Sequence, residues 1–230
     1  MKRVACFFAF ILLALNSQAQ FPDLTKQLTS KEVTKGLKDA LIQGTTKGAK
    51  VVSQIDGYFK NPEIKIPFPK DVQLVETKLR ALGMGKQVDE FILSLNRAAE
   101  DAAKQATPIF VSAIQKMTIE DAYAILKGEP DAATKYLNRT TTPQLKEKFT
   151  PVVKASLDKV NATKYYADLI GYYNRIPFIQ KVNPDLTGYA TDKAIDGLFV
   201  MIAKEEKNIR KEPVARTTDL LKKVFGNATK

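Results

Sequence analysis

The sequence predicts an all-α protein, a single-domain multi-helix bundle with one short extended, proline-containing strap at about 64–69. Apolar residues recur with the helical period along most of the chain. Two capping boxes, Thr29 with Glu32 and Thr118 with Asp121, mark the starts of helices. Only the strap alternates apolar residues with lysine or proline. With no fixed-period repeat and no low-complexity linker, we expect one helical domain over residues 20–230, with its core at about 30–226.

Residues 1–19 have the pattern of a cleavable signal peptide. Lys2 and Arg3 precede an apolar run over 4–15, which is shorter than the roughly 20 residues that a membrane-spanning helix needs. Small residues at 17 and 19 predict cleavage after Ala19. Cys6 lies inside the apolar run, which disfavours a lipid anchor. We expect an exported protein, periplasmic or associated with the outer envelope, with no transmembrane span after cleavage; an uncleaved anchor is the alternative.

The helices are delimited in order by capping residues, glycines and prolines. The first begins after Thr29 and ends at Asn61-Pro62. Gly83 and Gly85 form a hinge between the next two. Helices are expected at 30–58, 71–82, 85–105, 107–117, 119–127, 131–140, 143–160, 162–175, 187–211 and 213–225.

Four further positions set the later boundaries. Asp131 is expected to cap its helix, Pro143 to occupy a first helical position after Thr142, and Gly226 to close the last helix.

Glycines weaken the first helix at three positions, Gly36, Gly44 and Gly48. Each costs up to about 1 kcal/mol relative to alanine in a helix interior. The helix is therefore either broken or packed closely against a neighbour. After it, the strap Ile64-Lys65-Ile66-Pro67-Phe68-Pro69 is confined by its prolines to a sheet edge or to a position across the helices.

Composition excludes several kinds of chemistry. The chain has no histidine and one cysteine, which lies in the predicted leader. Serine–histidine and cysteine–histidine nucleophiles and histidine-ligated metals are therefore excluded in the mature chain. Carboxylates, lysines and oxygen-ligated hard cations remain. We expect no cofactor, identify no metal site and assign no catalytic residue.

The charge balance indicates the class of partner. Lysine and arginine total 36 against 25 acidic residues, a net charge of +11, which becomes +9 without Lys2 and Arg3. An exported basic protein suits a protein partner or an acidic envelope component, such as a lipid head group, lipopolysaccharide or glycan. Export and the lack of a recognisable motif argue against nucleic acid.

Two helices carry polar residues that a plain surface helix would not place there. On the helix at 85–105, Leu93, Asn96, Arg97 and Glu100 lie opposite a core face that includes Phe91. On the helix at 187–211, Glu205 projects into an apolar face. A buried carboxylate needs a cation or several donors, for which Arg97, Arg139, Lys193 and Arg210 are the candidates. The candidate polar cluster is Asn96, Arg97, Glu100, Arg139, Lys193, Asp196, Glu205, Glu206 and Arg210.

Each of these features also has a purely structural interpretation. The face with Arg97 is more typical of a solvated surface with an ion pair from Arg97 to Glu100 or Asp101. Glu205 is more often part of a buried ion pair that joins helices. Tyrosines form two stripes on the helix at 162–175, and these suit either packing or a ligand platform. The tyrosines are Tyr165, Tyr166, Tyr172 and Tyr173.

Several segments together resemble a known family. They run in order from about Val33 to Gly226, and they resemble the bacterial family named domain of unknown function 4197. The resemblance implies an envelope protein of one helical domain and implies no activity. Some members of the family look lipid-anchored. This chain differs from them, because Cys6 lies inside the apolar run and not at a cleavage site. The segments are 36–41, 61–67, 96–100, 131–136, 193–199, 205–210 and 220–226.

Three functions remain open at this level. The first is a non-catalytic binding or structural module for a protein, lipid or cell-wall partner in the envelope. The second is an enzyme that uses the carboxylates Glu100, Glu205 or Glu206, with or without a divalent cation. The third is a peripheral protein that binds an anionic membrane surface.

Overall fold

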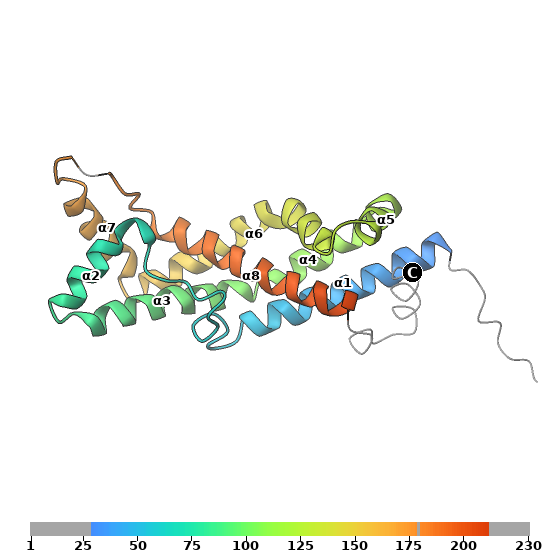
Figure 1. The fold of residues 1–230 in the computed structure, drawn as a ribbon, viewed down its shortest axis with the longest axis horizontal. Coiled ribbons are helices and arrows are strands. Elements are labelled where there is room, and N and C mark those ends of the chain that lie inside the picture. Colours follow the sequence, from blue (N-terminus) through green and yellow to red (C-terminus); the bar gives the residue numbers. More distant parts are fainter. Residues whose placement is uncertain (1–28, 179, 212–230) are drawn as a thin grey trace, which may run out of the picture.

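A computed structural model describes residues 29–178 and 180–211, which form an elongated bundle of helices (Figure 1). This confirms the all-α prediction. The predicted leader and the predicted helix at 213–225 lie outside the described residues. The helices are α1 (Ser30–Val52), the 3-10 helix η1 (Lys70–Val72), α2 (Gln73–Ala81), α3 (Gly85–Ala103), α4 (Ala106–Gln115), α5 (Ile119–Lys127), α6 (Ala132–Asp158), α7 (Ala162–Tyr173) and α8 (Leu186–Lys211).

The core runs along the bundle, where α8 packs against α1, α3 and α6. Buried apolar side chains from all four helices join one hydrophobic cluster. Within it, the rings of Phe110 and Phe199 meet edge to face with centroids 5.8 Å apart. The glycines of α1 serve this packing: a Cβ at Gly44 would lie 3.1 Å from Ile209, and one at Gly48 would lie 3.0 Å from Ile202. Close packing therefore explains these two glycines.

The first helix ends at Val52, so the predicted end at 58 is wrong. The backbone turns sharply at Asp56, whose φ is +68°. Tyr58 then enters the core, where it is fully buried. Its hydroxyl donates to the carbonyl oxygen of Ala194 on α8 at 2.5 Å. The capping box of Thr29 and Glu32 at the other end is confirmed, with both reciprocal bonds present.

The strap at 64–69 belongs to no helix or strand and lies across the helices, which is one of the two positions predicted for it. Ile64, Ile66 and Phe68 are buried, whereas Lys65 and Pro67 between them are exposed. Because buried and exposed side chains alternate, one side of the strap is part of the core and the other faces water. The strap connects the turn after α1 to η1 and α2.

A single helix, α6, spans the region where two helices were predicted, so the predicted boundary at Thr142-Pro143 is wrong. Both internal prolines, Pro143 and Pro151, are exposed, so the carbonyl groups that they displace can turn toward water. The opposite face carries a buried stripe at every fourth position. Burial of this stripe offsets the missing hydrogen bonds. The stripe is Leu137, Thr141, Leu145, Phe149, Val153 and Leu157.

Candidate functional site

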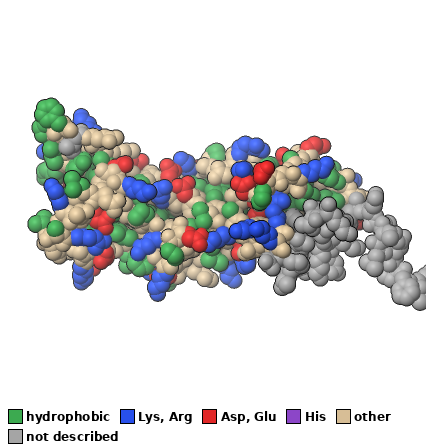
Figure 2. Space-filling model, viewed as in Figure 1, with side chains coloured by type: hydrophobic (Ala, Val, Ile, Leu, Met, Phe, Trp, Pro, Cys, Tyr) green, Lys and Arg blue, Asp and Glu red, His purple; other side chains and the backbone are tan. Residues whose placement is uncertain are grey.

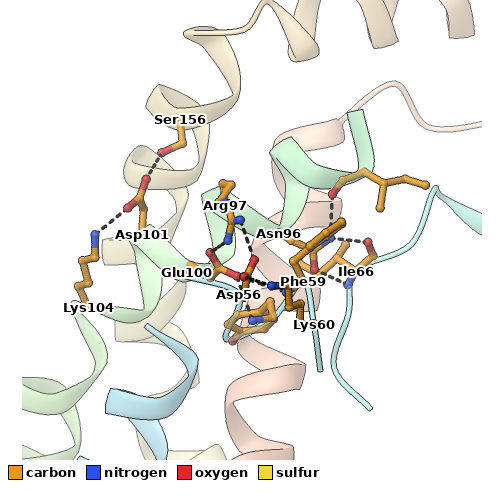
Figure 3. A network of polar contacts seen from close by, with 12 residues as sticks. Asp56, Phe59, Lys60, Ile66, Asn96, Arg97, Glu100, Asp101, Lys104 and Ser156 are labelled. Carbon is orange, nitrogen blue, oxygen red and sulfur yellow. Dashed lines mark hydrogen bonds and ion pairs between the residues drawn. The ribbon is translucent and has the colours of Figure 1, made fainter. Parts of the chain in front are cut away.

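A buried carboxylate on α3 holds the turn that follows α1 (Figure 3). Oε1 of Glu100 accepts from the backbone N–H groups of Tyr58 at 3.1 Å and Phe59 at 3.2 Å. Its Oε2 accepts from Nη1 of Arg97 at 2.6 Å, and Nη2 of Arg97 reaches Oδ1 of Asp56 at 2.7 Å. The predicted pair of Arg97 and Glu100 is therefore present. The hydrogen bonds of Glu100 hold the backbone of the turn and the side chain of Arg97 in place. Glu100 therefore has a structural role.

An amide on the same helix holds the strap (Figure 3). Oδ1 of Asn96 accepts from the N–H of Ile66 at 2.8 Å, and its Nδ2 donates to the carbonyl of Ile66 at 2.8 Å and to that of Ile92 at 2.7 Å. The side chain thus pairs with the strap as a neighbouring strand would. Asn96 and Glu100 are buried, so their predicted position on an outer face is wrong. The turn and strap cover that face.

The charges of this network support one another. The hydrogen bonds from Lys60 and then Arg97 lower the pKa of Asp56 below its ordinary value. The hydrogen bonds to Glu100 and then Asp56 raise the pKa of Arg97. Burial raises the pKa of Tyr58, helped by the nearby negative charge of Glu100. Asp56 and Arg97 therefore stay charged and Tyr58 stays neutral at neutral pH.

A second buried carboxylate, Glu206 on α8, caps the N-terminus of α6. It accepts from the N–H groups of Ala133 at 3.0 Å and Thr134 at 2.8 Å, and from the Thr134 hydroxyl at 2.8 Å. Arg210 donates to the same carboxylate from Nε at 3.0 Å and from Nη2 at 2.8 Å. Asp131 occupies the N-cap position, as predicted, but its side chain makes no capping bond. The distant Glu206 satisfies the free N–H groups instead.

The remaining members of the predicted cluster lie apart from these two networks. Glu205 pairs with Nζ of Lys47 on α1 at 2.9 Å, so none of the four cations proposed for it is the partner seen here. Lys193 and Asp196 form an exposed pair at 3.2 Å on α8. Arg139 is exposed on α6, with its guanidinium over the ring of Tyr136. The structure therefore distributes the cluster over several places.

The tyrosine stripes of α7 separate into an inner and an outer one. Tyr166 is buried, with its ring stacked on Phe91 at 6.0 Å between centroids, and burial raises its pKa to about 12. Tyr173 is half-buried. Tyr165 and Tyr172 on the other stripe are 65% and 70% exposed, so this stripe faces outward.

A groove lies between the outer side of α3 and the α6–α7 junction. Its volume is about 610 Å³, within the usual range for small-molecule sites. Phe91 and Leu93 line it from α3, and Val160 and Tyr165 face them from the other side. Arg97 also lines it, so the groove brings one residue of the predicted polar cluster to one of the predicted tyrosines.

The groove continues into a second hollow. This hollow has a volume of about 360 Å³ and shares Phe91 and Tyr165 with the first. It extends along Met84 of α3 and Leu169 of α7. Phe91 was predicted to belong to the core, and the α6–α7 junction with Val160 was not singled out. The groove exists only because these segments, which are distant in the chain, meet.

Comparison with known proteins identifies a family and nothing closer. A family model described as "Protein of unknown function (DUF4197)" matches residues 27–226. The chain belongs to this family. The match confirms the resemblance seen in the sequence. Neither the curated proteins nor the solved structures contain a significant match to this member of the family.

Two properties of this family member bear on its chemistry. In residues 29–178 and 180–211, no group of three or more acidic or cysteine side chains is arranged to hold a metal ion. Among the helices of the same residues, none is both long and apolar enough to cross a membrane.

Proposed function

We propose that this protein is a non-catalytic binding protein of the bacterial envelope, exported to the periplasm or the outer envelope. It holds an amphipathic molecule with an acyl or similar apolar chain in the groove along α3. The observation that carries the proposal is the groove itself. Val160 and Tyr165 remain more than half exposed on one of its walls, opposite Phe91 and Leu93 on α3. An exposed apolar wall that faces a half-buried apolar one favours an apolar occupant.

The dimensions and charges of the groove support this class of ligand. It follows α3 from Gln87 to Asp101, about 21 Å at the helical rise of 1.5 Å per residue. That length exceeds the roughly 15 Å of hydrocarbon in one leaflet of a bilayer. Lys159 and Arg97 line the groove near Asp101, and the guanidinium of Arg97 is already bonded to Glu100 and Asp56. Lys159 is therefore the cation that suits an anionic head group at this end.

The contacts of the buried carboxylates favour binding over acid–base catalysis. A general acid or base must reach the proton of a substrate directly or through one water. Glu100 and Glu206 instead hold backbone N–H groups and arginines, and Glu205 holds Lys47. Neither Glu205 nor Glu206 lines the groove.

The proposal is tested by filling the groove. Binding is followed by the fluorescence of 1-anilinonaphthalene-8-sulfonate and its displacement by oleate, with the dye excited directly at a wavelength that tyrosine and tryptophan do not absorb. Ser94 lines the groove, and Ser94→Trp places a large ring there. Ser112, also half-buried on a helix but outside the groove, supplies the matched control Ser112→Trp.

We expect Ser94→Trp to weaken oleate binding about tenfold, equal to about 1.4 kcal/mol, and Ser112→Trp to leave it unchanged. Lipid extraction of the purified protein followed by mass spectrometry should recover an amphipathic molecule. Equal oleate affinity in both variants, or no oleate binding by the unaltered protein, would overturn the proposal. Melting curves establish that both variants fold.

A further inference from the structure

The connection between α7 and α8 projects from one end of the bundle (Figure 1). Hydrophobic side chains gather at this projection on the surface (Figure 2). Ile176 is 52% exposed and Phe178 is fully exposed. A large ring left wholly in water is an unfavourable position for a monomeric protein surface.

The base of this loop is fixed. Nδ2 of Asn174 donates to the carbonyl of Val182 at 2.8 Å, and the N–H of Val182 donates to Oδ1 of Asn174 at 2.8 Å. Val182 is buried, so the returning chain is tied to the core. Phe178 has a φ of +65°, a conformation that costs a residue other than glycine roughly 1–2 kcal/mol. The loop therefore presents its ring outward on a closed base.

Aromatic side chains extend this surface along α7. Tyr165, Leu169 and Tyr172 share the outward stripe of the helix, and Ile176 continues the same spacing beyond its end. Tyrosine rings of this kind, with an apolar body and a polar tip, are enriched where hydrocarbon meets water.

Cations flank the apolar residues. Arg175 and Lys181 stand on either side of the loop, and Lys164 lies on α7. No ion pair within the described part of the chain engages any of the three. Over residues 159–185, four basic residues face two acidic ones, Asp168 and Asp185. The surface is therefore both apolar and positively charged.

We propose that this end of the molecule docks on the surface of an anionic lipid bilayer. Phe178 and Ile176 enter the head-group region, and Arg175 and Lys181 contact the lipid phosphates. The surface formed by Tyr165, Tyr172, Arg175, Ile176, Phe178 and Lys181 is hereafter the α7 tip. A convex apolar loop between cations fits a bilayer, because shallow insertion needs no matching pocket and the phosphates neutralise the charge.

The test measures how much of the protein floats with lipid vesicles in a density gradient. The protein is expressed from the full sequence in its host, so that any cleavage of the leader takes place. Vesicles of phosphatidylglycerol and phosphatidylethanolamine are compared with vesicles of phosphatidylcholine at 0.1 M salt. Phe178→Asn removes the ring and keeps a residue that tolerates positive φ, so the fold is retained. Ile55→Asn is the matched control, because Ile55 is 80% exposed in the turn after α1.

We expect the unaltered protein and Ile55→Asn to float with the anionic vesicles and to stay behind with the neutral ones. Phe178→Asn should lower the partition coefficient about tenfold, and Arg175→Glu with Lys181→Glu should lower it at least as much. Flotation of Phe178→Asn equal to that of the unaltered protein would overturn the proposal. So would equal binding to neutral vesicles.

A protein partner at the α7 tip is the competing outcome. Photo-crosslinking from position 178 in intact envelopes, with capture of one defined protein and no flotation, would also overturn the proposal. The α7 tip shares only Tyr165 with the groove, and Ser94 lies outside the tip, so Ser94→Trp should leave flotation unchanged.

Discussion

Replacing Glu206 with alanine should destabilise the protein strongly. Its carboxylate is the acceptor for the backbone N–H groups of Ala133 and Thr134 and for two donors of Arg210. Glu206 is only 6% exposed, so water replaces these bonds poorly. The substitution removes the cap of α6 and a carboxylate partner of Arg210 in one step.

The contacts give the magnitude. Loss of one member of a buried ion pair costs about 3–5 kcal/mol, and an unsatisfied buried donor costs about 1–3 kcal/mol. Arg210 keeps its bond to the carbonyl of Ile125 at 2.9 Å, and Thr134 is half-buried and reachable by water. We therefore expect a loss near the lower end, about 3 kcal/mol. With a urea slope of about 2 kcal/mol per M, the midpoint falls by about 1.5 M.

Urea unfolding followed by circular dichroism measures this loss. Glu147→Ala is the matched control, because Glu147 is exposed on α6 and pairs with the neighbouring Lys148 at 2.9 Å. It should change the free energy of unfolding by less than about 0.5 kcal/mol. If Glu206→Ala also changes the free energy of unfolding by less than about 0.5 kcal/mol, the cap does not stabilise the protein and our explanation of how α6 begins is wrong.

Substitution by alanine should change the free energy of unfolding in opposite directions at two helical glycines. A Cβ at Gly197 would lie 2.6 Å from the ring of the buried Tyr58, whereas one at Gly171 would meet nothing within 4 Å. Gly197→Ala should lower the unfolding free energy by about 1–3 kcal/mol and Gly171→Ala should raise it by about 0.5–1 kcal/mol, measured in urea; changes of equal sign would contradict this. Asp56, whose pKa is lowered chiefly by the hydrogen bond from Lys60, should stabilise the fold above about pH 4. Stability is lost as pH falls through the lowered pKa, so Asp56→Asn should be less stable than the unaltered protein at pH 7, and the gap should narrow as the pH falls below about 4; a constant gap would refute the assignment.

Local patterns predicted most of the helices because their signals need no distant partner. The capping boxes at Thr29 and Thr118 are closed by residues three positions away, and both are present. The strap was predicted from alternation and prolines alone. The wrong predictions concern helix boundaries that depend on contacts with residues far away in the chain. The turn that ends α1 depends on Glu100, which lies 42 residues beyond Tyr58. The continuity of α6 depends on its buried stripe.

The candidate site was predictable only in part. The sequence marked Arg97 and Tyr165 as unusual, and both line the groove. It could not predict that Asn96 and Glu100 face inward, because helical periodicity places a residue on a face without saying what covers that face. Nor could it identify Lys47 as the partner of Glu205.

By itself, the sequence determined the class of fold, the family and the range of chemistry, because composition, helical period and capping are local properties. Tertiary structure decided what each polar residue does. A buried carboxylate binds whichever donors the packing brings to it, and for Glu100 and Glu206 those are backbone N–H groups from segments far away in the chain. The groove on α3 and the α7 tip exist for the same reason, since each is a surface shaped by how the helices and their connections pack.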